Sequence, residues 1–432
     1  MWLPLRGYRD LRAGDGFLVT ALFYLSLGLF GAIPFALGIN GVSFTDAAFE
    51  SLSGLTTTGA TVFTGLDEMP RSLLLYRQLL QWFGGMGIIV LAVAILPMLG
   101  IGGMQLYRAE SPGPVKDTKL TPRITETAKA LWYIYVTLTV ACAASYYFAG
   151  MTPYDAISHA FSTVAIGGFS THDESIAFFD SPAVESVAMV FMLLAGINFG
   201  LHFTVFADRN PIHYFRDREV RAYLFMVTLV AVTVIAILWR FAEANPDSGL
   251  EPVRQGLFQT ISIATTTGFT TTNFSLWPGA APVLLLLAAF AGGCAGSTAG
   301  GIKVIRVLLI YLQGWREIKR LIHPNGVFPI KVGDQPVPDR VVEAVWSFFA
   351  AYVIIFLLMV TLVMILSPLD FETAFSAVGA CLNNLGPGLG EVALNYQGLE
   401  GSVKWVLIFA MLLGRLEIFT LLVLLTPTFW RR

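Results

Sequence analysis

Four short segments, each ending in glycine, recur along the chain at intervals of about a hundred residues. Each segment lies between two long apolar stretches. A repeat with this period indicates an architecture built from similar units, here four non-identical walls around one axis. The segments are Thr56, Thr57, Thr58 and Gly59; Val164, Ala165, Ile166 and Gly167; Thr265, Thr266, Thr267 and Gly268; and Asn383, Asn384, Leu385 and Gly386.

Composition decides the solvent in which these units fold. Hydrophobic residues make up 55% of the 432 residues and charged residues only 13%, about half the charge of a typical soluble protein. We therefore expect an all-α polytopic membrane protein. The three cysteines lie in apolar surroundings, and no Cys/His spacing resembles a metal site.

Eight apolar stretches are long enough to cross about 30 Å of hydrocarbon. Between the members of each consecutive pair lies a shorter segment, which fits a helix that enters the membrane only partway. The expected spans are 17–39, 73–99, 131–148, 184–206, 222–241, 281–310, 341–366 and 403–426. The expected short helices are 45–55, 154–163, 252–264 and 371–382, each ending at one of the four glycine turns.

Most of the 27 lysines and arginines fall in alternate connections and at both ends of the chain. By the positive-inside rule these segments, and both termini, are cytoplasmic. The pattern of span, short dipping helix, turn and span then occurs four times in the same orientation. The expected units are a cytoplasmic segment 1–16, repeat 1 at 17–107, repeat 2 at 108–216, repeat 3 at 217–320 and repeat 4 at 321–432.

The four turns are candidates for a selectivity filter. Irregular backbone at membrane depth survives only where it is buried in protein or lines a wet cavity. Four such turns around one axis can replace the water around an ion with carbonyl oxygens, to which threonine hydroxyls can add. The alternative is that each glycine only ends a short helix against a neighbouring span.

The sixth span contains a second irregular stretch. Five glycines within ten residues, together with a serine and a threonine, would weaken a helix at roughly 1 kcal/mol per glycine. The run could open into a loop that gates a pathway. The four-residue spacing of three of its glycines fits a closely packed pair of helices equally well. The residues are Gly292, Gly293, Gly296, Ser297, Thr298, Gly300 and Gly301.

Arg415 is the second candidate for a gate. The sequence predicts that it lies near the centre of the last span, where an unpaired arginine costs about 2.5–3.5 kcal/mol. Glu417 is two residues away and is not an obvious partner on the same helix face. An arginine facing a cavity would repel cations, whereas one paired with a carboxylate on another helix would only hold the bundle together.

Five motifs resemble the Trk-type bacterial potassium-uptake proteins (TrkH-like), in the wider Trk/Ktr/HKT superfamily. The resemblance runs from about Asp15 to the C-terminus. One loop departs from the family's usual pattern by having Ala299 where a glycine is common, and the family's longer members carry an extra helical pair before the first repeat. The motifs are GGMGIIVLAVAILPMLGIGGMQLYRAE (84–110), AIGGFSTHD (165–173), GGCAGSTAGGIKVIR (292–306), NNLGPGLGEVAL (383–394) and GRLEIFT (414–420).

The resemblance implies a pseudo-fourfold pore for potassium in the bacterial inner membrane, with the ion held by the turn residues. It also implies a homodimer, and a cytosolic ring of TrkA-like regulatory subunits that carry the nucleotide. In similar proteins the run that corresponds to 292–301 is an intramembrane loop just below the filter, and the corresponding arginine lies there as well. No covalent cofactor and no nucleic-acid partner is expected.

The function that these features favour is gated potassium entry driven by the membrane potential, which at 100 mV is worth about 2.3 kcal/mol per charge. The alternative is an ion-coupled secondary transporter working by alternating access, a class that commonly uses inverted repeats. The repeats expected here all face the same way. An enzyme is not expected, because the chain lacks a phosphate-binding loop, a zinc pattern and a catalytic Ser/His/Asp set.

Overall fold

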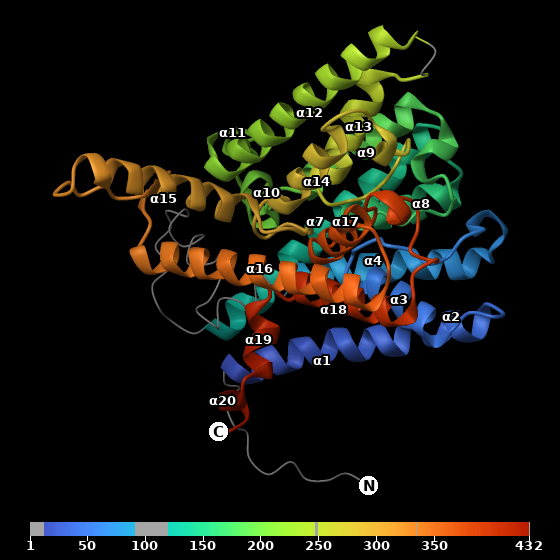
Figure 1. Ribbon diagram of the computed structural model, residues 1–432, viewed down its shortest axis with the longest axis horizontal. Coiled ribbons are helices and arrows are strands. Elements are labelled where there is room, and N and C mark those ends of the chain that lie inside the picture. The colour runs from blue at the N-terminus through green and yellow to red at the C-terminus, as the bar shows by residue number, and fades with distance from the viewer. Residues whose placement is uncertain (1–12, 91–119, 247–248, 334, 432) are drawn as a thin grey trace.

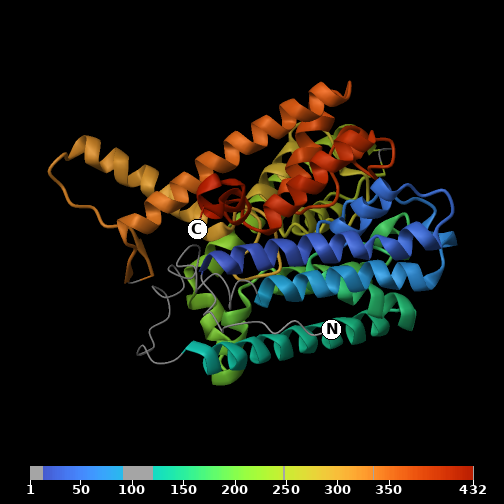
Figure 2. The ribbon, with the colours of Figure 1, turned by 90° about the horizontal axis from the view of Figure 1, so that it is seen from below.

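The computed structural model describes residues 13–90, 120–246, 249–333 and 335–431, and the chain there is almost entirely helical. The long helices run in roughly the same direction across the page in Figure 1. The described strands form one antiparallel hairpin, β1 (Lys331–Val332) with β2 (Gln335–Pro336). Figure 2 shows that the helix just before this hairpin projects beyond the rest of the molecule at one end.

The helices follow the predicted order of span, short helix and span four times. The first two groups are α1 (Ala13–Gly31), α2 (Ile33–Gly38), α3 (Phe44–Leu55) and α4 (Arg71–Val90), then α7 (Leu120–Phe148), α8 (Pro153–Ala165), α9 (Pro182–Ala195), α10 (Phe199–Asp208) and α11 (Ile212–Arg216). The last two groups are α12 (Arg218–Ala244), α13 (Pro252–Ala264), α14 (Ala281–Ala291) and α15 (Val304–Ile322), then α16 (Asp339–Leu366), α17 (Phe371–Leu382), α18 (Gly401–Arg415), α19 (Phe419–Leu425) and α20 (Pro427–Trp430). The predicted boundary between repeats 1 and 2, at 107/108, lies outside the described residues.

Four short helices, α3, α8, α13 and α17, correspond to the predicted dipping helices, and we call them the pore helices. Each is 12 or 13 residues long, or about 18–20 Å. Three begin at a side-chain cap, in which Ser43, Thr152 or Asp370 accepts a hydrogen bond from a backbone N–H of the first turn. The fourth has proline in its first turn, where a missing N–H costs nothing. A short 3-10 helix follows each turn: η1 (Leu66–Glu68), η3 (Ser175–Phe179), η5 (Phe274–Leu276) and η6 (Gly390–Val392).

The pore helices form the centre of the bundle and the longer helices surround them. Nine of the twelve residues of α3 are buried, and so are nine of the twelve residues of α17. In the surrounding helix α12, by contrast, only 28% of the most apolar stretch is buried, and Phe225, Leu229 and Val232 are more than half exposed. Large apolar side chains exposed all along a helix of this length fit a surface that faces lipid.

Within the described residues, four helical segments are long and apolar enough to cross a membrane, or six if each of two bent pairs counts as one span. The prediction of a continuous fourth span and a continuous eighth span is wrong. The fourth bends by 95° between α9 and α10, and the eighth bends by 115° between α18 and α19. The predicted second span extends past Val90 into residues that the structure does not describe. The sixth is interrupted from 292 to 303, between α14 and α15.

Candidate functional site

The four turns share one backbone conformation. In each, a residue other than glycine adopts a left-handed conformation, with φ between 51° and 65°, and its N–H donates to the carbonyl three residues earlier. The next N–H donates to the carbonyl five residues before it. Backbone of this kind is uncommon for such residues and concentrates at functional sites. The left-handed residues are Thr57, Ile166, Thr266 and Asn384.

This pattern shifts the second turn by one residue relative to the sequence alignment. Ile166 occupies the position of Thr57 and Thr266, so that Gly168, rather than Gly167, matches Gly59 and Gly268. Gly168 has a φ of 77°, close to the 79° of Gly59 and the 84° of Gly268. The equivalent segment of repeat 2 is therefore 165–168, and the glycine pair at 167–168 made either register possible in the sequence.

The four turns meet one another in a closed ring. A methyl group added at Gly59 would overlap the carbonyl oxygen of Gly167, and one added at Gly168 would overlap that of Thr267. A methyl group at Gly268 would lie 3.1 Å from the nitrogen of Gly386, and one at Gly386 would lie 2.6 Å from the oxygen of Gly59. Each turn thus contacts the next, and the fourth contacts the first. None of the four positions leaves room for a further side chain, which explains the glycines.

The threonine hydroxyls of turns 1 and 3 are mostly used inside the protein. Thr56 and Thr58 share a hydrogen bond of 2.8 Å between their hydroxyls, and Thr265 and Thr267 share one of 2.7 Å. Thr266 Oγ1 accepts from Gly300 N at 2.7 Å. These hydroxyls fix the turns, which leaves backbone oxygens as the main groups that an ion could meet.

The glycine-rich run of the sixth span is a loop, so the alternative of a closely packed helix pair is wrong. The loop lies against turns 3 and 4 and against Val164, the residue just before turn 2. Thr298 Oγ1 donates to Val164 O at 3.0 Å, Gly301 N donates to Asn383 O at 3.1 Å, and Gly300 N donates to Thr266 as described. All seven predicted gate residues of this run therefore lie in one segment next to the turns.

Arg415 joins the same region, although its predicted place at the centre of a span is wrong. It is the last residue of α18, at the 115° bend. Its side chain is 3% exposed, and Nη1 donates to Thr298 O in the loop at 3.1 Å. Among the described residues no carboxylate forms an ion pair with it. The contact is thus with the loop, and the alternative of an interhelical ion pair is not what the structure contains.

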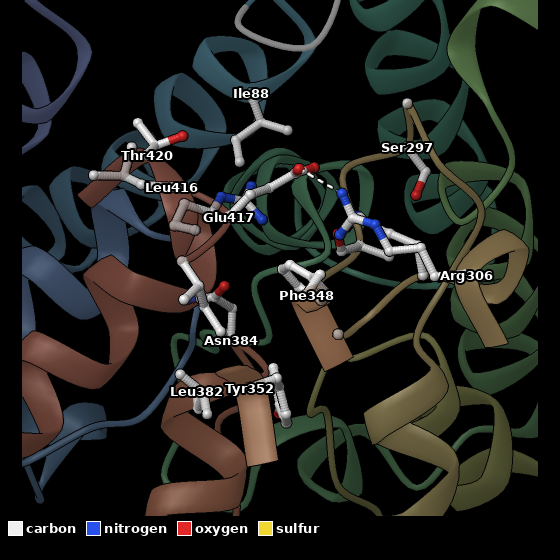
Figure 3. Close-up of a pocket in the computed structure, with 18 residues that line it drawn as sticks. Ile88, Ser297, Arg306, Phe348, Tyr352, Leu382, Asn384, Leu416, Glu417 and Thr420 are labelled. Carbon is white, nitrogen blue, oxygen red and sulfur yellow. Dashed lines mark hydrogen bonds and ion pairs between the residues drawn. The ribbon is translucent and has the colours of Figure 1, made fainter. Parts of the chain in front are cut away.

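A small cavity lies beside the loop, and residues from the loop, α15, α16 and the bend after α18 line it (Figure 3). Figure 3 shows Arg306 and Glu417 pointing toward each other across it. Arg306 Nη2 lies 2.6 Å from Glu417 Oε2, and its guanidinium lies 4.3 Å from the ring centroid of Phe348. The cavity holds several charged groups in a buried place, which is typical of a functional region. They are Lys303, Arg306, Arg415 and Glu417.

A family model, described as TrkH, a cation transport protein, matches residues 5–431. The chain belongs to this family. It is 59% identical to the Trk system potassium uptake protein TrkH of Vibrio parahaemolyticus over 100% of this chain and 89% of the relative. It is 55% identical to TrkH of Escherichia coli K12 over the same shares, and 42% identical to TrkG of that organism over 98% of this chain and 86% of the relative.

The fold agrees with a solved member of the TrkH family. The crystal structure of the potassium transporter TrkH from Vibrio parahaemolyticus matches with a TM-score of 0.90 at 55% identity, covering 99% of this chain and 88% of that one. This TrkH-family chain is therefore a polytopic helical membrane protein with four pseudo-symmetric repeats. Family membership also makes it a cation transport protein.

Two features of the TrkH-family site were not found from the sequence. The Arg306–Glu417 pair joins residues far apart in the chain, and each alone fits an ordinary charged residue near a helix end. The bend between α9 and α10 also belongs to the site, because Cys294 N donates to Gly196 O at 2.9 Å and Phe199 N donates to Gly296 O at 3.0 Å. The sequence signal for this bend was Gly196 close to Asn198, because asparagine favours the start of a new helix.

Proposed function

We propose that this protein takes up potassium across the bacterial inner membrane through a gated, channel-like pore. The observation that carries the proposal is the closed ring of four turns, in which backbone oxygens of three turns lie against the glycine of a neighbouring turn. An ion stripped of water needs several oxygen ligands in a fixed arrangement, and such a ring offers them. The relatives named as potassium uptake proteins support potassium as the ion.

The filter of this proposal consists of the residues predicted from the sequence, with Gly168 taking the place of Val164 in the second turn. The potassium ligands are backbone oxygens of 56–59, 165–168, 265–268 and 383–386. Each pore helix ends at its turn, so that its negative C-terminal end is directed toward a cation on the axis. Because three of the turns contain a single glycine and the second contains a pair, in place of a longer glycine-containing signature, we expect looser discrimination against sodium than in strict potassium channels.

The gate of this proposal is the loop 292–303 together with Arg415. The loop lies directly against the turns, and a buried cation beside it opposes the passage of another cation. Opening would require the loop and Arg415 to move away from the axis. An inside-negative potential of 100 mV contributes about 2.3 kcal/mol to the entry of one charge, enough to drive uptake.

The assembly and orientation belong to the same proposal. We expect a homodimer, with the ends of the chain and the projecting helix α15 on the cytoplasmic side, where lysines and arginines are concentrated. A separate nucleotide-binding subunit of the TrkA type would act on the gate from that side. The printed names of the relatives, which describe parts of a Trk system, support a multi-component assembly.

Cation flux into proteoliposomes tests the proposal. We expect the purified protein to take up rubidium and potassium, with weaker uptake of sodium. Gly168→Ala should lower the flux at least about a hundredfold, because the added methyl group overlaps the Thr267 carbonyl and the φ of 77° is unfavourable for alanine. The matched control is Gly398→Ala, which meets no atom within 4 Å. Equal flux in the two variants, or no preference of the unaltered protein for potassium, would refute the proposal.

A further inference from the structure

Each pore helix carries a residue at the same register position, seven residues before the left-handed residue of its turn. The register follows from the left-handed residues, which align the four repeats. At this position the four helices differ in chemistry, because one residue is acidic, one is a histidine, one is an amide and one is apolar. They are Glu50, His159, Gln259 and Ala377.

In every repeat, a side chain of the pore helix forms a hydrogen bond with the segment that follows the turn. Glu50 Oε2 accepts from Val62 N at 2.9 Å, and Gln259 Oε1 accepts from Thr271 N at 3.3 Å. Ser376, next to Ala377, accepts from the equivalent Leu389 N at 2.8 Å. In repeat 2, His159 Nε2 lies 2.9 Å from Ser170 Oγ. At this register position only repeat 1 has a carboxylate. In repeat 2 the carboxylate of Asp155, about one turn earlier on the pore helix, accepts from Thr171 Oγ1 at 2.9 Å.

The carboxylate of Glu50 has a buried ionic partner. Arg77, on α4, places Nε and Nη2 each 2.7 Å from Glu50 Oε1, and the two side chains are 1% and 0% exposed. Burying two charges is expensive unless their remaining hydrogen-bonding groups are satisfied as well. The remaining groups of this pair are hydrogen-bonded, because Glu50 also accepts from Thr61 Oγ1 at 2.9 Å. The pair carries no net charge that a passing cation would meet.

Arg77 extends the contact from repeat 1 to repeat 2. Its Nη1 donates to Ser170 O at 3.0 Å, and its Nη2 lies 3.2 Å from Thr61 Oγ1. Its guanidinium also lies 4.2 Å from the ring centroid of Phe169, the residue directly after the second turn. One planar side chain is thus bonded to the segments that follow turn 1 and turn 2. A lysine has a single ammonium group in place of the planar guanidinium and could not make these contacts at the same time.

We propose that the Arg77–Glu50 pair is a brace that fixes the separation of turns 1 and 2 and thereby sets the preference of the ring for potassium over sodium. This rests on the proposed function. Arg77 and Glu50 act as positioning residues, since neither belongs to the ring itself. A ring of oxygens discriminates by the spacing and number of its ligands, and the brace controls that spacing at one of the four contacts between turns.

The test compares brace variants with a control at another boundary between repeats. Arg77→Lys and Glu50→Gln should each lower the ratio of potassium to sodium uptake about tenfold, the factor that corresponds to losing one interaction of about 1.4 kcal/mol. The control is Arg254→Met. Arg254 also forms a partly buried ion pair, 2.9 Å from Glu185, but touches no turn. The control should lower the melting temperature and leave the uptake ratio unchanged.

A gentler variant covers the case in which the charged variants fail to fold. Thr61→Val keeps the shape of the side chain and removes the hydroxyl that contacts both Glu50 and Arg77. It should lower the uptake ratio about threefold. Folded brace variants with the unaltered uptake ratio would overturn the inference, as would an equal loss of selectivity in Arg254→Met. Failure of the unaltered protein to prefer potassium would instead refute the proposed function.

Discussion

The two ends of the bundle are built differently. We call one end of the bundle the turn end, because the segments that follow the four turns lie there together with the starts of the pore helices. We call the opposite end, which carries α15 and α19, the basic end. At the turn end every boundary between neighbouring repeats is bridged. The bridges are Asp173 accepting from Gly65 N and Leu66 N, Arg254 with Glu185, Gly390 N donating to Ser275, and Lys404 with Asp46.

The basic end has interrupted helices in place of this closed set of bridges. The fourth span bends by 95° and the eighth by 115°, and a loop of twelve residues interrupts the sixth span. The Arg306–Glu417 ion pair connects two of these interruptions, since Arg306 follows the loop and Glu417 lies in the last bend. If the proposed function holds, the bridged end keeps the pore in place and the interrupted helices at the other end move when the gate opens. Changes at the turn end should alter stability or selectivity, whereas changes at the basic end should alter flux.

Among changes that compare the two ends, the largest effect on flux is expected at the basic end. Arg415→Ala should raise rubidium flux in proteoliposomes about tenfold, because it removes a buried positive charge and its bond to Thr298 from the proposed gate. Melting temperature should change little. Arg221→Ala, which removes an exposed arginine, serves as the control. A destabilised variant with unchanged flux would show that Arg415 only supports the bundle.

A second variant addresses the link between the two interruptions. Glu417→Gln weakens the contact with Arg306 and should raise flux about threefold. Reversing the pair, with Arg306→Glu and Glu417→Arg in one protein, should return flux toward the original value. If the reversed pair remains as active as Glu417→Gln, the contact does not restrain the gate.

The turn end should respond in the opposite way. Lys404 is 5% exposed and its Nζ lies 2.6 Å from Asp46 Oδ1. Lys404→Met leaves that carboxylate without its partner and should destabilise the protein by about 2–3 kcal/mol, visible as a lower melting temperature. Flux per folded molecule should stay the same. Lys331→Met, at an exposed position, is the control, and a large change of flux in Lys404→Met would contradict this difference between the two ends.

The smallest effect depends on pH. His172 contacts Asp67 and lies 3.4 Å from Asp155, with its ring stacked on Phe178. Burial alone would lower the pKa of His172, but the bonds and charges of Asp155 and Asp67 outweigh it and raise the pKa above its ordinary value. The histidine therefore stabilises the fold most below about pH 6.5, and this contribution is lost as pH rises through the raised pKa.

His172→Gln makes the effect measurable. The melting temperature of the original protein should exceed that of the variant by about one or two degrees at pH 6, and the gap should narrow by pH 8.5. His213→Gln, which removes the imidazole near Asp208 at the basic end, is the control. A gap that widens with rising pH would mean that the neutral ring is the stabilising form.

Local patterns predicted much of the fold. The pore helices α13 and α17 begin and end where the sequence placed them, because proline or aspartate marks their starts and a turn marks their ends. The bend at Leu416 was not predictable, since no proline or nearby run of glycines interrupts the last span. It depends on contacts with the distant loop, such as that of Arg415 with Thr298.

The candidate site was predictable in outline but not in register. The turns and the glycine-rich run were found because glycine marks irregular backbone. The one-residue shift in repeat 2 was missed because Gly167 and Gly168 are adjacent, and the sequence alone could align either with Gly59. The brace at Glu50 and Arg77 was missed for another reason, as its partners come together only through the packing of α3 and α4.

All four walls of the ring belong to one polypeptide. In a channel assembled from identical subunits, any mutation appears in every wall at once. Here evolution can alter a single quadrant, which is how one repeat can carry an acid while its counterparts carry a histidine, an amide and a methyl group. The ion preference of such a chain can therefore change by mutation of one repeat at a time, while the other three repeats keep the opening intact.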